Sequence, residues 1–588
     1  MVYTVVTMSV GDCGCLLRQE EFPAGGCMLS DIEIAQQNVM EPVTEIAGRL
    51  GLVSQDLDLY GSYKAKLTLS TLKSLQQKAA VNPARLVLVT AITPTSAGEG
   101  KSTVSVGLAD SLNSIGKRTV LALREPSLGP CFGVKGGACG GGHAQIVPME
   151  DINLHFTGDI HAVSITTNLI ASLIDNHIHQ GNELGIDPRT ISWRRCLDLN
   201  DRELRKVVVG LGGTPNGIPR EDGFTIAVAS EIMAILCLSR SIAELKERLG
   251  NVIIASTYGG RMVQLRELGG VGACAALMKD AIRPNLVQTL EKNPAFVHGG
   301  PFANIAHGCN SLNATLSALA LGDYVVTEAG FAADLGAEKF LDIKCRIGGL
   351  KPSAVVVVAT IRALKMHGGV EKAGLSQPNV KAVELGFANL RLHLENLAKF
   401  GLPTVVAVNQ FVSDTQEEIA CLQSLCQGAG ARAILCQVWE KGSQGGQELA
   451  RAVAQMCDDQ ASGQGFRFLY PSELPLAEKI GVLAREIYRA GDVEISPVAL
   501  KKIRRYEQAG YGNLPVCMAK TQNSISHNPS WSGAPCGYTF PVRDVQLYAG
   551  AGFVVALAGD IMTMPGLPKI PAAYSMDVDE NGNISGLF

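Results

Sequence analysis

No class of residue is present in large excess in this chain. Aromatic residues make up only 5% of it, and 51 Lys and Arg stand against 55 Asp and Glu, which leaves a formal charge of -4. Nucleic-acid-binding domains carry a marked excess of basic residues, so this balance gives no support to a nucleic-acid partner. No apolar run approaches the roughly 18 residues that a membrane-spanning helix requires. We therefore expect no membrane segment.

The cysteines lack the spacings that mark disulfide frameworks or zinc sites. The chain has 16 of them, with no CxxC pair, scattered through segments of apolar character. Such a pattern is typical of free, mostly buried thiols in a reducing compartment, and we expect a cytoplasmic protein. Cys13 and Cys15 lie close together near the start, which is only thin support for a metal or redox site.

Glycine and short Val/Ile runs are abundant instead. The 588 residues include 64 Gly, and 46% of them are hydrophobic. This composition favours helices layered on a sheet, and the length suffices for three or four domains. Residues 1–27 have no clear period and lack the charged and apolar regions of a secretory signal. We expect the folded unit to start near Met28, with a helix capped by Ser30 or Asp31, and the segment before it to be disordered or not native.

A glycine-rich loop organises the sequence. Residues 86–92 form a short apolar, β-branched run that predicts a buried strand, and residues 103–115 have apolar positions at helical spacing. The loop between them ends in Gly-Lys-Ser-Thr and predicts a phosphate cradle (P-loop), in which backbone N–H groups and Lys101 hold phosphates and Ser102 approaches Mg²⁺. Thr95 stands where the first Gly of the usual pattern is expected. The expected ATP-binding residues are Thr93, Thr95, Ala97, Gly98, Glu99, Gly100, Lys101, Ser102 and Thr103.

The next predicted strand, residues 119–123, delivers Arg124 and Glu125 to its carboxyl end. Ligands of open α/β sheets lie at that end of the strands, so Arg124 is expected beside the phosphates, where its planar guanidinium suits an oxyanion. Considered alone, an Arg that follows a strand is as often a solvent-exposed residue without a binding role as it is a ligand-binding residue.

Residues 133–145 are unusually rich in glycine. Glycine at this density is costly in backbone entropy, and we interpret it as backbone that approaches a ligand closely, with a flexible linker as the alternative. Lys64 and Lys66 belong to a basic, aromatic patch that is either a solvated face or part of an anion site. Residues 207–213 superficially resemble a dinucleotide fingerprint, but the third Gly is missing and we read them as a turn. Residues 354–359 and 403–409 predict further buried strands.

Nine segments in this order resemble formate–tetrahydrofolate ligase, the bacterial single-function form of 10-formyltetrahydrofolate synthetase. They are TPTSAGEGKST (93–103), REPSLGP (124–130), NLHFTGDIH (153–161), ASEIMAIL (229–236), FVHGGPFANIAHG (296–308), TEAGF (327–331), LKMHGG (364–369), GYGNLP (510–515) and MTMPGLP (562–568). The resemblance covers about residues 28–588. Residues 1–27 fall outside it.

The resemblance implies a three-domain α/β protein that assembles as a homotetramer. Its P-loop NTPase-like, parallel-sheet nucleotide domain would comprise residues 28–135 and 275–395, with residues 136–274 inserted as a second α/β domain and 396–588 forming a third. It further implies that ATP phosphorylates formate to formyl phosphate, which the N10 amine of tetrahydrofolate (a polyglutamate in the cell) then attacks. Mg²⁺ accompanies the ATP, and a monovalent cation is an open requirement.

The resemblance also implies roles for single residues. Lys101 would pair with the γ-phosphate and then with formyl phosphate, Arg124 would grip formyl phosphate, and Glu125 is the acid beside it. His155 and His161 match positions near the reacting centre, as positioning or proton-handling groups, although a lone His is more often structural. Phe411 and Trp439 match the aromatic pair that stacks on the folate ring, while Ser102 or Thr103 would approach the metal.

Several positions depart from the family pattern, including Cys139, His143, Ala332 and Val412. Ala332 matters if that backbone needs a positive φ, because a Cβ is then strained. Two other functions therefore remain open, namely another P-loop ligase that activates a carboxylate, and a nucleotide-binding scaffold whose catalysis has lapsed.

Overall fold

The computed structural model describes residues 29–81, 83–96, 98–133, 139–459, 465–559 and 561–587. The N-terminal segment 1–27, Ala97 of the P-loop and part of the glycine-rich stretch 133–145 lie outside the described residues. The first described helix, α1 (Asp31–Gln37), is capped by Ser30 in a reciprocal capping box with Glu33, which confirms the predicted helix and its Ser30 cap.

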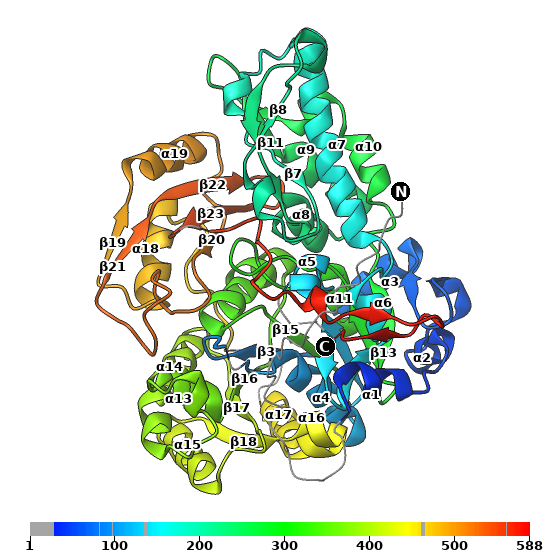
Figure 1. Ribbon diagram of the computed structural model, residues 1–588, viewed down its shortest axis with the longest axis vertical. Helices are drawn as coiled ribbons and strands as arrows, with labels where there is room; N and C mark the ends of the chain where they lie inside the picture. The colour runs from blue at the N-terminus through cyan, green and yellow to red at the C-terminus, as the bar shows by residue number, and fades with distance from the viewer. Residues whose placement is uncertain are drawn as a thin grey trace, which may run out of the picture.

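A central twelve-stranded sheet is the core of the molecule, in the lower half of Figure 1. Its main order is β1 (Leu57–Leu59), β2 (Ala65–Leu67), β13 (Asn285–Thr289), β14 (Pro294–Val297), β4 (Thr119–Leu123), β15 (Tyr324–Glu328), β3 (Arg85–Ala91), β16 (Ala354–Ala359), β17 (Thr404–Asn409) and β18 (Arg432–Cys436), with β5 (Gly140–Gly141) and β6 (Ala144–Val147) attached beside β13. The strands predicted at residues 86–92, 119–123, 354–359 and 403–409 are confirmed as β3, β4, β16 and β17.

All pairings from β14 to β18 are parallel. Seven strands therefore end at one edge of the sheet, and the loops that follow them meet there. The strands are buried on both faces, because alternate side chains enter different cores. In β3, Val87 and Val89 pack into one hydrophobic cluster, whereas Leu86 and Leu88 pack into another.

Helices cover both faces of this sheet. α4 (Lys101–Ser114) and α17 (Gln447–Asp459) contribute to the cluster with Val87, whereas α3 (Leu69–Val81), α11 (Leu312–Leu321) and α14 (Val380–Lys399) contribute to the one with Leu88. The remaining elements around the sheet are α2 (Val43–Arg49), α5 (Leu128–Gly133), α6 (Met149–Asn153), α12 (Arg346–Gly348), α13 (Ile361–His367), α15 (Gln416–Gly428), α16 (Val438–Lys441), β24 (Asp577–Val578) and β25 (Ile584–Ser585).

Two smaller lobes stand on the sheet, so the fold is a multi-domain α/β fold. The upper lobe of Figure 1 contains α7 (Asp159–His179), α8 (Glu231–Leu238), α9 (Ile242–Asn251), α10 (Val271–Leu277), β7 (Arg195–Cys196), β10 (Phe224–Thr225), β11 (Ile253–Ser256) and β12 (Met262–Gln264). The left-hand lobe contains α18 (Leu476–Glu486), α19 (Pro497–Gln508), β19 (Asp492–Ile495), β20 (Val516–Ala519), β21 (Thr539–Val542), β22 (Asp544–Tyr548) and β23 (Phe553–Leu557). The exact domain boundaries stay a prediction, and β17 and β18, which follow residue 395, run in the central sheet.

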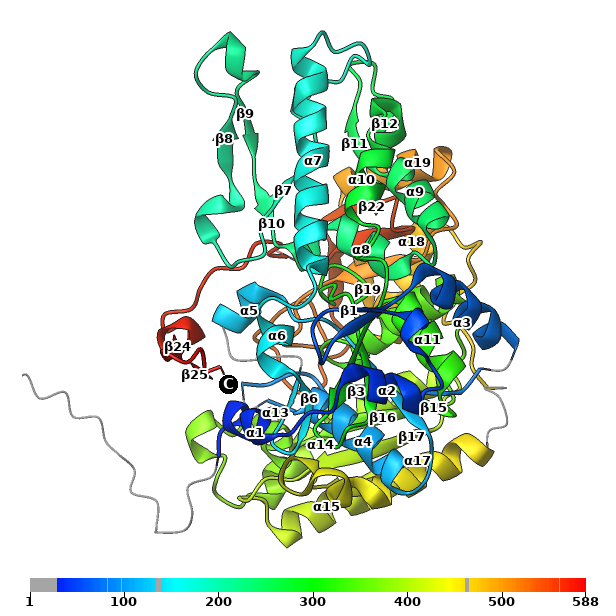
Figure 2. The same ribbon diagram turned by 90° about the vertical axis from the view of Figure 1, so that its right-hand side faces the viewer.

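Two local interpretations differ from the structure. Residues 207–213 are not only a turn, because β8 (Val207–Val209) pairs with β9 (Arg220–Asp222) in a hairpin that projects beside α7 (Figure 2). Lys64 and Lys66 make no open basic patch: Lys64 pairs with Asp151, and Lys66 lies fully buried against Asp159. The register of β2 turns Lys66 inward, which its sequence neighbours did not indicate.

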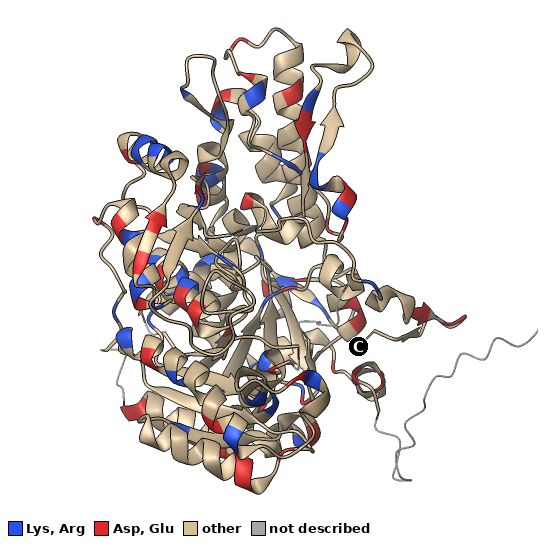
Figure 3. Ribbon diagram, turned by 60° about the vertical axis from the view of Figure 1, so that its left-hand side comes forward, with Lys and Arg blue, Asp and Glu red and all other residues tan. Residues whose placement is uncertain are grey.

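The surface agrees with the balanced composition. Figure 3 shows basic and acidic residues intermingled over the face it presents. Among the described helices, none has the length and apolar character to span a bilayer. Every cysteine in the described ranges is a free thiol, and most are buried, as predicted.

Candidate active site

The P-loop joins the end of β3 to the start of α4. Gly98 and Gly100 adopt left-handed φ values of 75° and 72°, a conformation in which a side chain would be strained. A Cβ on Gly100 would also lie 2.3 Å from Asn409 Nδ2, and that amide donates a hydrogen bond to the Glu99 carbonyl at 3.1 Å. The loop is therefore held against the end of β17, and the free N–H groups at the start of α4 face the carboxyl edge of the sheet.

Thr93 fixes the start of this loop. Its N–H donates to Asn389 Oδ1 at 3.2 Å, and its carbonyl accepts from His367 Nε2 at 2.9 Å. Its hydroxyl contacts His393 Nε2 at 3.1 Å. With three polar groups tied to α13 and α14, Thr93 acts as an anchor of the cradle.

Glu328, at the end of β15, interacts with other polar side chains of the site. Its carboxylate is buried and accepts a hydrogen bond from Ser102 Oγ at 2.8 Å, and Arg124 Nη2 lies 3.7 Å from its other oxygen. Burial lowers the pKa of Lys101, and the negative charge of Glu328 opposes that shift. Ser102 and Arg124 thus meet at one carboxylate, because β3, β4 and β15 are neighbours in the sheet, and the charge of Glu328 also acts on Lys101.

Sequence reasoning missed Glu328 as a site residue. The signal was available, since a single acid ends an otherwise apolar strand, but its significance depends on β15 lying between β3 and β4. That order of strands is a long-range property, which the local pattern of residues 324–328 does not contain.

Arg124 is packed against a tight corner at residues 330–332. A Cβ on Gly330 would lie 2.9 Å from Arg124 Nη1, and Phe331 has a φ of 58°. Ala332, by contrast, is extended, with a φ of -102° and a ψ of 176°. The condition under which Ala332 would be strained is therefore not met, because the positive φ falls one residue earlier.

Glu125 is buried behind Arg124. Its N–H donates to the Gly299 carbonyl at 3.0 Å. Burial raises the pKa of Glu125 well above its usual range, the charge of Asp159 adds to this, and Lys66 opposes it. This shift favours the neutral form of the Glu125 carboxyl group, in which it can donate a hydrogen bond.

Glu99 is the acid within the P-loop itself. One of its carboxylate oxygens accepts hydrogen bonds from the N–H of Thr95 at 2.7 Å and from its hydroxyl at 3.1 Å. Burial raises the pKa of Glu99 to about 7, although these hydrogen bonds oppose the shift. Its charge therefore changes near neutrality, next to the phosphate cradle.

The residues present fit a magnesium ion. Ser102 Oγ and Glu328 lie 2.8 Å apart at the mouth of the cradle, and Mg²⁺ takes oxygen ligands, usually one or two from protein and the rest from phosphates and water. Within the described residues, no group of three or more His, Cys, Asp or Glu forms a metal site of its own. Thr103, the other predicted ligand, is partly buried in the first turn of α4.

His155 and His161 are less closely integrated. Both side chains are exposed, on the segment before α7 and in its first turn. In the described part of the chain, neither imidazole makes a hydrogen bond or ion pair with Lys101, Arg124 or Glu125. Their role near the reacting centre stays a prediction.

Phe411 and Trp439 follow the adjacent strands β17 and β18. The Arg362 guanidinium lies 4.4 Å from the centre of the Phe411 ring, and Trp439 is 38% exposed at the start of α16. A Cβ on Gly142 would lie 2.2 Å from the Trp439 carbonyl, and His143 N donates to that carbonyl at 2.8 Å. Gly141 and Gly142 therefore pack against Trp439, whereas a Cβ on Gly140 would meet the Ala144 carbonyl. Residues 134–138 lie outside the described residues, and the predicted close approach to a ligand stays a prediction.

Comparison with known proteins identifies the family. Residues 29–588 match the family described as formate–tetrahydrofolate ligase. The chain belongs to this family. A protein of Paracoccus denitrificans (strain Pd 1222) named formate–tetrahydrofolate ligase is 58% identical over 561 residues, which is 95% of this chain and 100% of that protein. One of the same name from Sphingobium sp. (strain NBRC 103272 / SYK-6) is 58% identical over 559 residues, covering 95% and 99%.

As a member of this family, the protein is an ATP-dependent ligase of one-carbon metabolism that joins formate to tetrahydrofolate. The resemblance on which the sequence-based assignment depended is confirmed, and the match begins at residue 29, next to the predicted start at Met28.

Proposed function

We propose that this ligase makes 10-formyltetrahydrofolate through a formyl phosphate intermediate held by Lys101 and Arg124. Formate is a poor acyl donor because its oxygen does not leave, and transfer of the γ-phosphoryl group of ATP turns that oxygen into part of a phosphate. The N10 amine of tetrahydrofolate then attacks the formyl carbon, and inorganic phosphate departs. Both steps place negative charge where cations and N–H donors stabilise it most.

The observation that carries this proposal is that Ser102, next to Lys101 at the start of α4, and Arg124 both lie against Glu328. An ion pair of Arg124 at 3.7 Å and a hydrogen bond of Ser102 at 2.8 Å leave both side chains within reach of a single phosphoryl group. Glu125, in its protonated form, would donate a hydrogen bond to the same group. The ATP phosphates would lie on Gly98, Gly100 and the start of α4.

The folate ring would stack between Phe411 and Trp439. Their positions after neighbouring strands support this, because parallel strands lie about 4.8 Å apart and their loops share one edge. Stacked aromatic faces suit a flat heterocycle. Val412, which departs from the family pattern beside Phe411, is 99% exposed and so does not fill the space between the two rings.

Several finer features belong to the same proposal. Mg²⁺ bound with ATP would be held at Ser102 and Glu328, with Thr103 nearby, and would supply charge neutralisation of the phosphates. His155 and His161 would orient substrate or carry protons at the rim. A homotetramer, a cytoplasmic location, a polyglutamate form of the folate and a monovalent cation are expectations from the family resemblance.

The test is ADP formation measured with each substrate omitted in turn. This ligase should release ADP only when formate and tetrahydrofolate are both present. With a P-loop ligase for another carboxylate, ADP release would not depend on tetrahydrofolate. A nucleotide-binding scaffold without catalytic activity would bind ATP and release no ADP. Either result would overturn the proposal.

A further inference from the structure

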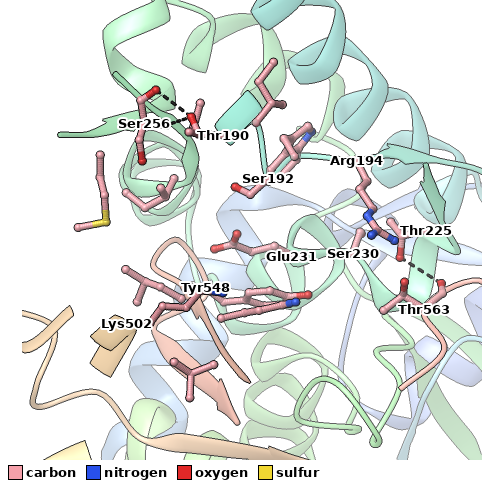
Figure 4. Close-up of a pocket in the computed structure, with 18 of the residues that line it drawn as sticks. Thr190, Ser192, Arg194, Thr225, Ser230, Glu231, Ser256, Lys502, Tyr548 and Thr563 are labelled. Carbon is pink, nitrogen blue, oxygen red and sulfur yellow. Dashed lines mark hydrogen bonds between the residues drawn. The ribbon is translucent and has the colours of Figure 1, made fainter. Parts of the chain in front are cut away.

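A second cavity, separate from the P-loop, lies between the two smaller lobes. It has a volume of about 740 Å³, within the range of cavities that hold organic ligands. The upper lobe supplies one wall through α8 and the segment before β7, and β22 and α19 of the left-hand lobe supply the other (Figure 4). None of the ATP-binding residues predicted from the sequence lines it.

Glu231 occupies the centre of this cavity. One of its carboxylate oxygens accepts hydrogen bonds from the N–H groups of Gly550 at 2.8 Å and Ala551 at 3.2 Å, which joins the two lobes. The other oxygen makes no hydrogen bond to a described residue, and Figure 4 shows the carboxyl group between Ser192 and Tyr548. Burial raises the pKa of Glu231 to about 8, although the two N–H donors oppose the shift. At neutral pH this group therefore carries a proton that it can donate.

Two further donors face the same space. Tyr548 and Arg194 line the cavity together with Glu231, and Figure 4 shows all three side chains around it. Burial raises the pKa of the Tyr548 hydroxyl, so it remains a donor at neutral pH. Arg194 is exposed and has neither a hydrogen bond nor an ion pair with any described residue; in Figure 4 its guanidinium reaches toward Ser230 and Thr225. A guanidinium, a phenol and a protonated carboxylic acid together form a donor set for an oxyanion.

The other cations that line the cavity have polar partners. Arg189 lies 2.7 Å from Asp187, and Arg505 donates hydrogen bonds to Ser256 Oγ at 3.0 Å and to the Gly260 carbonyl at 2.7 Å. Lys502 lies 2.7 Å from Asp544, and Arg220 lies 2.8 Å from Asp175. Arg505, like Arg194, forms no ion pair with a described residue, but Arg194 is the lining cation that lacks both an ion pair and a hydrogen bond among the described residues. The rest of the lining is mixed. Its apolar part includes Ile253, Met262, Ile305, Val545 and Leu557, and its polar part consists mainly of Ser and Thr side chains, with Glu221 and Asp222 at the rim.

We propose that this cavity binds an organic oxyanion with a flat apolar body, in which Arg194 pairs with the anionic group and Tyr548 and Glu231 donate hydrogen bonds to it. Each part of such a ligand has a match, since the charge meets the unpaired guanidinium and the body displaces water from the apolar lining. The site is independent of the ligase reaction proposed above, so its failure would leave that reaction untouched.

The probe is 8-anilinonaphthalene-1-sulfonate, a fluorescent aromatic sulfonate whose own charge does not change between pH 6 and 9. The full chain should bind one equivalent with enhanced fluorescence, and saturating ATP and tetrahydrofolate should leave the binding unchanged. Arg194→Ala should weaken it at least about tenfold, since one charge-assisted hydrogen bond contributes about 1.5 to 3 kcal/mol. Arg432→Ala, which removes an exposed Arg on β18 outside the cavity, is the matched control.

The pH dependence supplies an independent signature. Above pH 8 ionised Glu231 would repel the sulfonate, so wild-type affinity should fall, whereas Glu231→Gln keeps both a donor and an acceptor and should bind equally at pH 7 and pH 9. The charged and titratable groups that line the cavity around Glu231 are Arg189, Arg194, Arg220, Glu221, Asp222, Lys502, Arg505, Tyr506 and Tyr548. Unchanged binding by Arg194→Ala, or displacement of the dye by ATP or tetrahydrofolate, would overturn the proposal.

Discussion

Lys101 carries the largest share of the proposed catalysis. Lys101→Ala should reduce kcat by at least about a thousandfold, because a missing cation at the transferring phosphoryl group leaves charge uncompensated in both transition states. ADP release dependent on formate and tetrahydrofolate measures this, and thermal unfolding should be little changed.

Lys246→Ala is the matched control, because Lys246 is exposed on α9 and far along the chain from the P-loop. Near-normal turnover by Lys101→Ala would remove the P-loop assignment, whereas equal losses in both variants would point to general damage.

Trp439 tests the folate site. Trp439→Ala should raise the KM for tetrahydrofolate roughly tenfold and leave the KM for ATP nearly unchanged, since a lost stacking contact and its buried area are worth about 1 to 1.5 kcal/mol. Steady-state kinetics with each substrate varied give the comparison. Trp439→Phe retains an aromatic face against Gly142 and should recover most of the affinity. Parallel rises in both constants would contradict stacking.

Single-residue chemistry was largely predictable from the sequence, but side-chain surroundings were not. The helix and strand pattern around Gly98–Gly100 identified the cradle because glycine, lysine and serine act there through local geometry. Lys66 and Glu328 were misjudged or missed, since their partners Asp159 and Arg124 come from elements that are distant in sequence. Burial and pairing of charges are set by strand order, which residue spacing alone does not encode.

At the scale of one element, the P-loop carries its own titrating group. Because burial raises the pKa of Glu99 to about 7, the carboxyl group is neutral below that pH and negative above it. A negative charge beside the triphosphate disfavours binding, so the KM for ATP should rise between pH 6 and pH 8.

Glu99→Gln should flatten this rise, because the amide keeps an acceptor for Thr95 and does not ionise. The measurement is the KM for ATP of the wild type and the variant between pH 6 and pH 8. The KM for tetrahydrofolate, measured over the same pH range, is the internal comparison. If the KM for ATP of the variant rose with pH as steeply as that of the wild type, Glu99 would be excluded as the titrating group.

The corner after β15 should be equally sensitive. In Gly330→Ala the new Cβ would lie 2.9 Å from Arg124 Nη1 and 2.9 Å from the Ala303 Cβ, so Arg124 has to shift. A displacement of about 1 Å in a group that grips the substrate costs on the order of a hundredfold in kcat/KM.

The control is Gly272→Ala in α10, where an added Cβ meets nothing within 4 Å. That variant should keep full activity and gain about 0.5 to 1 kcal/mol in the free energy of unfolding. Full activity of Gly330→Ala would mean that Arg124 does not depend on this corner.

At the scale of the whole molecule, the alternation of strands and helices was enough to predict a layered α/β fold. The order of the sheet was not predictable, because β13 and β14 insert beside β4 from a point more than 160 residues later in the chain. The cavity between the lobes was equally hidden, since its walls come from residues near 190–260 and 500–563.

Removal of residues 1–27 should leave activity and assembly unchanged, because the family match begins at residue 29 and the Ser30 cap closes α1 without them. Steady-state kinetics and light scattering of the shortened chain would check this. A loss of either property would show that the ligase depends on its first residues.

The carboxylate of Glu328 has a consequence for selectivity. It is a counter-ion of Arg124 and accepts the hydrogen bond of Ser102, so an anion that binds either side chain competes with it. A formate ion carries one negative charge, as the Glu328 carboxylate does, so Arg124 attracts the two about equally. A phosphoryl group with two or more negative charges is attracted more strongly. In the proposed mechanism, the difference in charge would therefore favour formyl phosphate over free formate at this site, independently of molecular shape.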